Sequence, residues 1–95
     1  MTPATGEAAI RKRLQAIPNV GPRVADDLYR LGIHKLDDLK GRDGDLLYAE
    51  ICRIDQVRHD PCCRDVFAAV IAIAEGHPPQ PWYAFTAARK ARDAK

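Results

Sequence analysis

The chain has 95 residues, of which 46% are hydrophobic and 29% charged, and its formal net charge is +2. A chain of this length forms one domain with a single modest core, and its weak positive charge excludes a strongly basic, histone-like protein. No apolar run approaches the roughly 20 residues of a membrane span, and the N-terminus lacks the apolar centre of a signal peptide. We therefore expect no membrane partner, and the odd number of cysteines, which argues against a disulfide framework, favours a reducing cytoplasm.

Hydrophobic residues at helical spacing predict two helices in the first third of the chain. Ile10 and Leu14 lie on one face of a helix over residues 7–16, with basic residues on the remaining face. Pro22 suits the first position of a second helix, where its missing N–H costs nothing. That helix stops at Gly32, a residue typical of a helix C-terminus.

Three more helices follow, each with its own start signal or stop signal. A short helix is predicted over 36–40, and Asp43 is placed to cap a fourth helix. Asp60 and Pro61 repeat the start signal for a fifth helix, which runs to about Glu75. Because no segment shows the two-residue alternation of a strand, the sequence predicts an all-α, five-helix domain.

The composition changes after the fifth helix. The stretch HPPQPWY contains three prolines, which prevent a continued helix and predict an extended segment. Trp82, Tyr83 and Phe85 are candidate anchors; Trp82 either packs onto the domain, which we favour, or stacks on exposed bases. The final residues form a basic helix or a frayed tail. We thus divide the chain into a helical domain, 7–76, and a C-terminal tail, 77–95.

An internal repeat is suggested by two similar segments. IPNVGPRVADDL (17–28) aligns with IDQV (54–57) followed by DPCCRDVF (60–67). Each copy has two apolar residues three positions apart and then a proline-led helix. The repeat predicts two hairpins related by an approximate two-fold axis. The alternative is a chance resemblance of two proline-led helices.

The turn within residues 17–24, IPNVGPRV, is the strongest candidate for a functional site. A sharp turn needs a residue that tolerates a positive φ or a close backbone approach, and we expect Gly21 to supply it, with Asn19 next best. The turn leads into a helix N-terminus, whose unpaired N–H groups and positive dipole end favour phosphate. Arg23 adds a formal charge. The alternative is a turn that merely joins two helices.

This turn resembles the hairpin of helix-hairpin-helix proteins, which bind the backbone of duplex DNA without reading its sequence. Their pattern is apolar-x-Gly-apolar-Gly, and here Ala25 matches the small position of the second helix while Asn19 replaces the first glycine. The resemblance implies backbone N–H donation from Gly21 and Val24 and a charge-assisted contact from Arg23. The expected DNA-binding residues are Lys12, Asn19, Val20, Gly21, Arg23, Val24 and Lys35. Whether the C-terminal tail extends this DNA-binding surface is left open.

Several separate blocks between about residues 10 and 85 resemble the small bacterial family of pathogenicity locus proteins, some of which are named mitomycin resistance proteins. The blocks are IPNVGPRVADDLYRLGI, LDDLKGRD, LYAEIC, DPCCRDVFAAV and the Trp-containing tail. The resemblance implies a connection with DNA and no catalytic residues. The fold that we expect is sterile-alpha-motif-like, built of two pseudo-symmetric hairpin units. The second unit is degenerate, because Asp60 stands where the first has Gly21.

The cysteines do not predict a metal site or a disulfide. Cys52, His59, Cys62 and Cys63 match no common zinc spacing, and an odd number of cysteines argues against a disulfide framework. We expect reduced thiols, with Cys63 buried on the face of its helix that also carries Phe67. No oxyanion site or third group accompanies a Cys/His pair. We therefore expect no catalysis, no metal and no cofactor.

The function that these observations favour is weak, sequence-independent binding of duplex DNA, in DNA maintenance or damage tolerance. The alternative is a protein-interaction module that keeps the fold without the DNA contact, its partner being an unidentified protein. The near-neutral charge and the acidic segment 36–56 favour this alternative. Asp26 and Asp27 also follow the candidate phosphate site directly and are expected to repel a second phosphate. Direct drug binding is a more distant third possibility.

Overall fold

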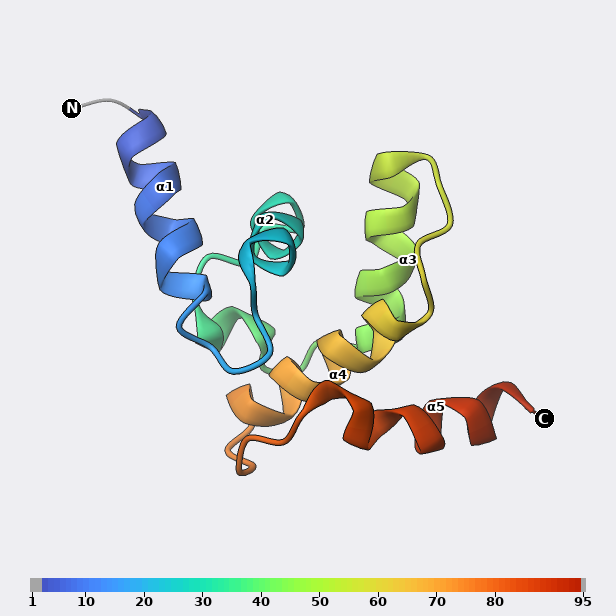
Figure 1. Ribbon diagram of the computed structural model, residues 1–95. Helices are drawn as coiled ribbons and strands as arrows, with labels where there is room; N and C mark the ends of the chain where they lie inside the picture. The colour runs from blue at the N-terminus through green and yellow to red at the C-terminus, as the bar shows by residue number, and fades with distance from the viewer. Residues whose placement is uncertain (1–2, 95) are drawn as a thin grey trace.

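The chain is all-helical over residues 3–94, the part that the computed structural model describes, with side chains from residue 6 onward (Figure 1). This part contains five α-helices, two short 3₁₀-helices and no strand, so the all-α prediction with five helices is confirmed. The elements are α1 (Pro3–Leu14), α2 (Pro22–Arg30), η1 (Leu36–Leu39), α3 (Gly44–Asp55), α4 (Cys62–Ala74), η2 (Trp82–Phe85) and α5 (Thr86–Asp93).

The identity of the fifth helix differs from the prediction. The helix expected over 36–40 is a single 3₁₀ turn, η1. The turn ends at Lys40, whose backbone is extended (φ −61°, ψ 133°), and Gly41 follows in the left-handed conformation with φ 74°. The basic C-terminal residues instead form a regular helix, α5, which is the fifth α-helix of the chain.

The helix boundaries agree with the local signals in the sequence. Asp43 caps α3, its carboxylate accepting hydrogen bonds from the backbone N–H of Asp45 (2.8 Å) and Leu46 (3.3 Å). Gly32 follows α2 with φ 86° and Gly76 follows α4 with φ 95°, the left-handed conformation that commonly ends a helix.

The hydrophobic core is organised around α4. α3, η1, η2 and α5 all pack against α4, whereas α1 packs against α2. In Figure 1, α1 and α2 lie on one side of the molecule, α3 on the other, and α5 runs along the base. Side chains of α2 and α4 join one buried cluster, to which they contribute Ala25, Leu28, Phe67 and Val70. The two proline-led helices therefore share a core.

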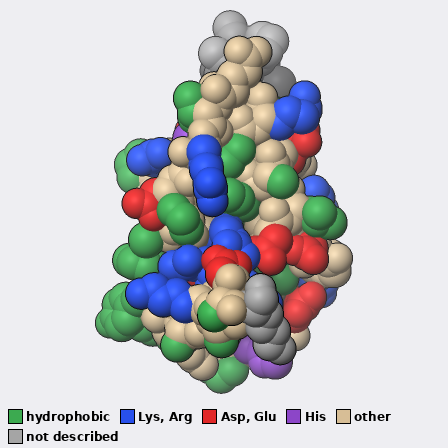
Figure 2. Space-filling model, turned by 90° about the vertical axis from the view of Figure 1, so that its right-hand side faces the viewer, with side chains coloured by type: hydrophobic (Ala, Val, Ile, Leu, Met, Phe, Trp, Pro, Cys, Tyr) green, Lys and Arg blue, Asp and Glu red, His purple; other side chains and the backbone are tan. Residues whose placement is uncertain are grey.

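The C-terminal segment is attached to the helical domain through ion pairs. Asp65 of α4 is only 1% exposed and accepts hydrogen bonds from Arg89 Nε and Thr86 Oγ1, each at 2.8 Å. Arg64 contacts both carboxylate oxygens of Asp93, at 2.7 and 3.0 Å. Figure 2 looks onto this side of the molecule and shows basic and acidic side chains gathered next to one another. The domain boundary after residue 76 stays a prediction.

The length and the hydropathy of a helix decide whether it can cross a bilayer. Among the described residues, no helix is both long enough and apolar enough to cross a bilayer.

Candidate nucleic-acid interface

The turn between α1 and α2 takes its left-handed conformation at Asn19, not at Gly21. Asn19 has φ 76°, whereas Gly21 has φ −92° and ψ −174°, which is extended backbone open to any residue. The expectation that Gly21 supplies a positive φ or a close backbone approach is therefore wrong, since a Cβ added there also meets no atom within 4 Å. Asn fits the left-handed position because its short polar side chain tolerates that conformation better than other side chains do.

The Asn19 side chain is bonded to the C-terminal segment. Its Nδ2 donates to the carbonyl of Gln80 (2.8 Å), and its Oδ1 accepts from the backbone N–H of Trp82 (2.9 Å). These two bonds fasten the turn to the segment that precedes η2. Sequence reasoning missed this role because the partners lie more than sixty positions away, beyond the reach of any local pattern.

The apolar residues of the turn are packed inward. Val20 is 7% exposed and Ile17 8% exposed, and Val24 lies half-buried against the core. The N–H of Val20 is already used, since it donates to the carbonyl of Ile17 at 3.1 Å. The Val20 side chain therefore anchors the turn in the core. The part of Val24 that we consider for a ligand contact is its backbone N–H.

The N-terminus of α2 is open. Gly21 is the N-cap residue and forms no side-chain capping hydrogen bond. The first intrahelical bond runs from Ala25 N–H to the Gly21 carbonyl (2.9 Å), so the N–H groups of Arg23 and Val24 have no acceptor within the helix. A Cβ placed on Gly21 meets no atom within 4 Å. These N–H groups and the positive end of the helix dipole form an accessible anion-binding arrangement.

Arg23 lies in this first turn with its side chain exposed. Its guanidinium is 3.4 Å from Nδ1 of His59, a long and weak hydrogen bond. His59 is itself held through Nε2, which lies 2.7 Å from the carboxylate of Asp55. Arg23 thus extends from the first turn toward the turn between α3 and α4, with little to restrain it.

The two acidic residues that follow Arg23 are paired with arginines. Asp26 lies 2.9 Å from Arg11 and 3.1 Å from Arg30, and the buried Asp27 lies 2.6 Å from Arg30. Arg30 also bonds to Asp55, and that hydrogen bond is the main cause of the raised pKa of Arg30. Asp26 and Asp27 share these two arginines with Glu7 and Asp55. Their negative charges are therefore offset only in part, which reduces the repulsion expected from the sequence.

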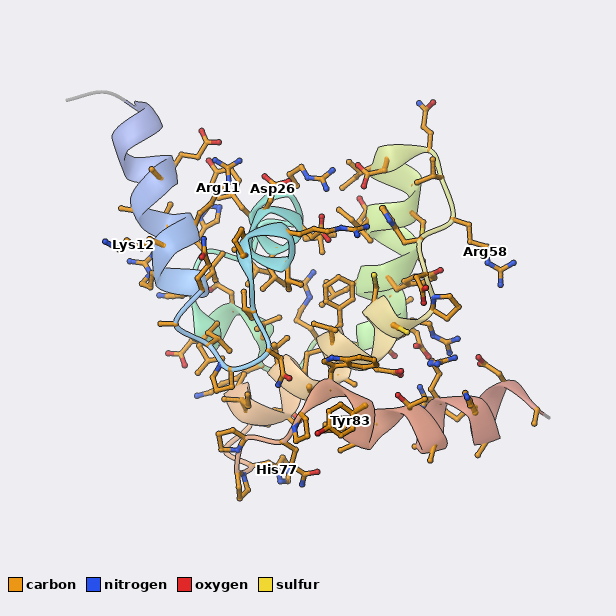
Figure 3. The ribbon with its side chains drawn as sticks, in the orientation of Figure 1. Arg11, Lys12, Asp26, Arg58, His77 and Tyr83 are labelled. Atoms are coloured by element: carbon orange, nitrogen blue, oxygen red, sulfur yellow. The ribbon has the colours of Figure 1, made fainter. Side chains whose placement is uncertain are left out.

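The two predicted flanking lysines, Lys12 and Lys35, are both exposed. Lys12 points outward from α1, while the neighbouring Arg11 points toward Asp26 of α2 (Figure 3). Lys35 is exposed and follows His34, whose carbonyl accepts a hydrogen bond from Arg13 of α1 at 2.9 Å.

The second turn differs from the first in packing and in capping. Gln56, which aligns with Asn19, is also left-handed, with φ 55°. Ile54 and Val57 are 36% and 53% exposed, unlike their buried counterparts in the first turn. Asp60 accepts a hydrogen bond from Cys62 N–H at 2.8 Å, which lowers the pKa of that carboxyl. The N-terminus of α4 is therefore occupied by a carboxylate of the chain itself.

The three cysteines are free thiols, and all are half-buried. Cys63 was expected to be buried, but it lies only partly covered at the edge of the core, and desolvation raises the pKa of its thiol. Cys52 accepts a hydrogen bond from His59 N–H at 3.3 Å. Within the described part of the chain, no three His, Cys, Asp or Glu side chains come together in a way that suits a metal ion.

Two surface hollows lie away from the first turn. The larger, of about 420 Å³, is lined by residues of α3 and the loop before it together with Leu31. The smaller, of about 270 Å³, lies where α3, Arg64 and Arg92 meet. Neither hollow includes a residue of 17–24, so the candidate interface is an exposed turn rather than a cavity.

The sequence comparisons assign the chain to a family. Residues 7–91 match the Pathogenicity locus family, and the chain belongs to that family, which confirms the resemblance inferred from the sequence. The chain is also similar to the Mitomycin resistance protein McrB of Streptomyces lavendulae, with 36% identity over 77 residues that cover 81% of this chain and 73% of that protein. No solved structure matches the chain.

Proposed function

We propose that this protein is a non-catalytic helix-hairpin-helix protein that binds the backbone of duplex DNA through the N-terminus of α2. The observation that carries the proposal is the backbone conformation of Gly21 and the empty space around it. Neither backbone conformation nor internal packing requires a glycine at this position. Its missing side chain leaves the first-turn N–H groups open to a phosphate, which is a good ligand for such a terminus.

The contrast between the two turns supports one functional hairpin and one degenerate hairpin. Asn19 and Gln56, at matching positions of the suggested repeat, are the non-glycine residues with positive φ in the described chain. This agreement supports the two-hairpin, sterile-alpha-motif-like arrangement. In the second hairpin the carboxylate of Asp60 accepts from the N–H of Cys62, the first residue of α4, where a phosphate is expected to bind. A single hairpin grips one strand, so binding is weak.

The charges near the first turn fit binding to the backbone rather than to base edges. Arg23 is exposed and only weakly bonded, and arginine forms strong charge-assisted bonds with phosphate. Contacts of this kind fix position without reading sequence. We further propose that the activity serves DNA maintenance or damage tolerance in the cytoplasm, a role compatible with a relative named for mitomycin resistance.

The decisive experiment replaces the open N-cap by a carboxylate. In Gly21→Asp, the new side chain caps α2 as Asp43 caps α3, so folding stability is kept or rises slightly. The carboxylate also occupies the phosphate position and offsets the positive end of the helix dipole. DNA affinity therefore falls to background. Affinity is measured by fluorescence anisotropy with a labelled mixed-sequence duplex at low salt.

Gly6→Asp is the matched control, because it adds the same charge at another open glycine. We expect it to bind nearly as well as the parent. Equal binding by Gly21→Asp and the parent would show that the α2 N-terminus is not the contact site.

A protein-interaction module is the second candidate function. It is favoured by exposed aliphatic side chains on α3 and the turn after it, namely Leu46, Ile54 and Val57. Isolated exposed apolar residues are common, whereas a group of them is more typical of a docking surface. Absence of duplex binding at low salt, with no amide shift in residues 19–25 on titration with DNA, favours this candidate over the first.

A further inference from the structure

In the described part of the chain, the exposed large apolar side chains are three aliphatic ones and one aromatic one, Tyr83. The 3₁₀-helix η2 has three residues per turn, so Trp82 and Phe85 share a face. Both are half-buried on the helix that packs against α4. Tyr83 lies off that face and is 66% exposed. The anchoring expected of all three aromatic residues thus applies to two of them.

Tyr83 is also held next to the candidate DNA-binding turn. The residue before it, Trp82, donates its backbone N–H to Oδ1 of Asn19 at 2.9 Å. The carbonyl of Gln80 accepts from the same side chain at 2.8 Å. These bonds fix the backbone that carries Tyr83 against the turn, and Figure 3 shows Tyr83 at the edge of the molecule where this segment runs.

The Tyr83 ring contacts the ring of its neighbour Trp82. It packs edge-to-face with Trp82, the ring centroids being 5.8 Å apart and the planes at 85°, a favoured geometry for aromatic pairs. The backbone of Trp82 is in turn fixed by its N–H bond to Asn19, and its side chain is half-buried. A restrained aromatic ring loses little conformational entropy on binding, which favours its use as a contact residue.

We propose that Tyr83 stacks on an unstacked DNA base beside the phosphate held by the α2 N-terminus. This inference rests on the proposed function and names its preferred ligand. In an intact duplex the base faces are covered by their neighbours, so Tyr83 has nothing to stack on. A gap or an unpaired base exposes a π-face that a tyrosine ring binds regardless of base identity. The preferred ligand is therefore an interrupted duplex.

The test compares two DNA molecules of the same sequence and length, one intact and one with a single-nucleotide gap. We expect the parent protein to bind the gapped molecule about 5- to 150-fold more tightly, the range that one stacked base provides. Tyr83→Phe keeps the preference, because the ring remains. Tyr83→Leu and Tyr83→Ala lose it and bind both molecules with the parent's affinity for intact duplex. Thermal unfolding checks that each variant is folded.

The outcomes separate this inference from the proposed function. If the parent binds both molecules equally, or if Tyr83→Ala keeps the preference, the inference is overturned while backbone binding stands. If the parent binds neither molecule, both fail. The Gly21→Asp variant, assayed on intact duplex, tests the proposed function by itself.

Discussion

At the scale of single residues, Asn19 and Gly21 have separate roles in the turn between α1 and α2. Asn19 takes the left-handed conformation and fastens the C-terminal segment, so Gly21 is free of both tasks. The sequence indicates correctly that a special conformation is needed within 17–24. It does not indicate which residue adopts it, because both Asn and Gly tolerate a positive φ and only the path of the chain decides.

Arg23→Ala is the residue-scale test of the proposed charge contact. Removing one phosphate contact weakens binding to all duplex sequences alike, since backbone contacts carry no sequence information. With two or three phosphates neutralised, the parent's slope of log affinity against log salt is roughly −2 to −3, and the variant's slope is shallower by about 1. Stability changes little because the side chain is exposed and its bond to His59 is weak.

The measurement is an anisotropy titration at four or more salt concentrations with two unrelated duplexes. Arg53→Ala is the control, because Arg53 is exposed and paired locally with Glu50 on α3. An Arg23→Ala slope equal to the parent's would place the DNA contact elsewhere on the surface.

At the scale of elements, local signals and long-range contacts differ in how well the sequence predicts them. The starts of α2 and α3 follow from Pro22 and Asp43, which act within one turn of their helix. The attachment of α5 follows from Asp65 and Arg89, which are 24 positions apart. The sequence shows a basic tail at this point, and only the folded chain shows that part of its charge is consumed in ion pairs.

Asp65→Ala is expected to release α5 from α4. The substitution leaves the mostly buried Arg89 without its main partner, and breaking a buried pair in this way costs about 3 kcal/mol or more. The far-ultraviolet circular dichroism should lose the helical signal of α5, and the free energy of urea unfolding should fall. Asp37→Ala is the control: its exposed pair with Lys40 is worth less than about 1 kcal/mol. A fully helical, equally stable Asp65→Ala protein would contradict this account.

At the scale of the whole molecule, carboxylates connect the elements. Asp55 joins α3 to Arg30 of α2, and Asp93 joins α5 to Arg64 of α4. The bonds to these arginines are the main cause of the lowered pKa of each carboxyl. The packing of the helices against each other therefore depends on these groups remaining ionised.

Acid should loosen this architecture in a defined pH range. A carboxyl whose pKa is lower in the folded state than its ordinary value, 3.8 for Asp, stabilises the fold fully at pH above that value. This contribution is lost as pH falls through the lowered folded-state pKa. The urea midpoint should therefore change little from these groups between about pH 7 and pH 5 and decline below about pH 4. Asp93→Asn should be less stable at neutral pH and show a shallower decline in acid, because Asn has no proton to gain. If that variant declines as steeply as the parent, the Arg64–Asp93 pair is not among the groups that set acid stability.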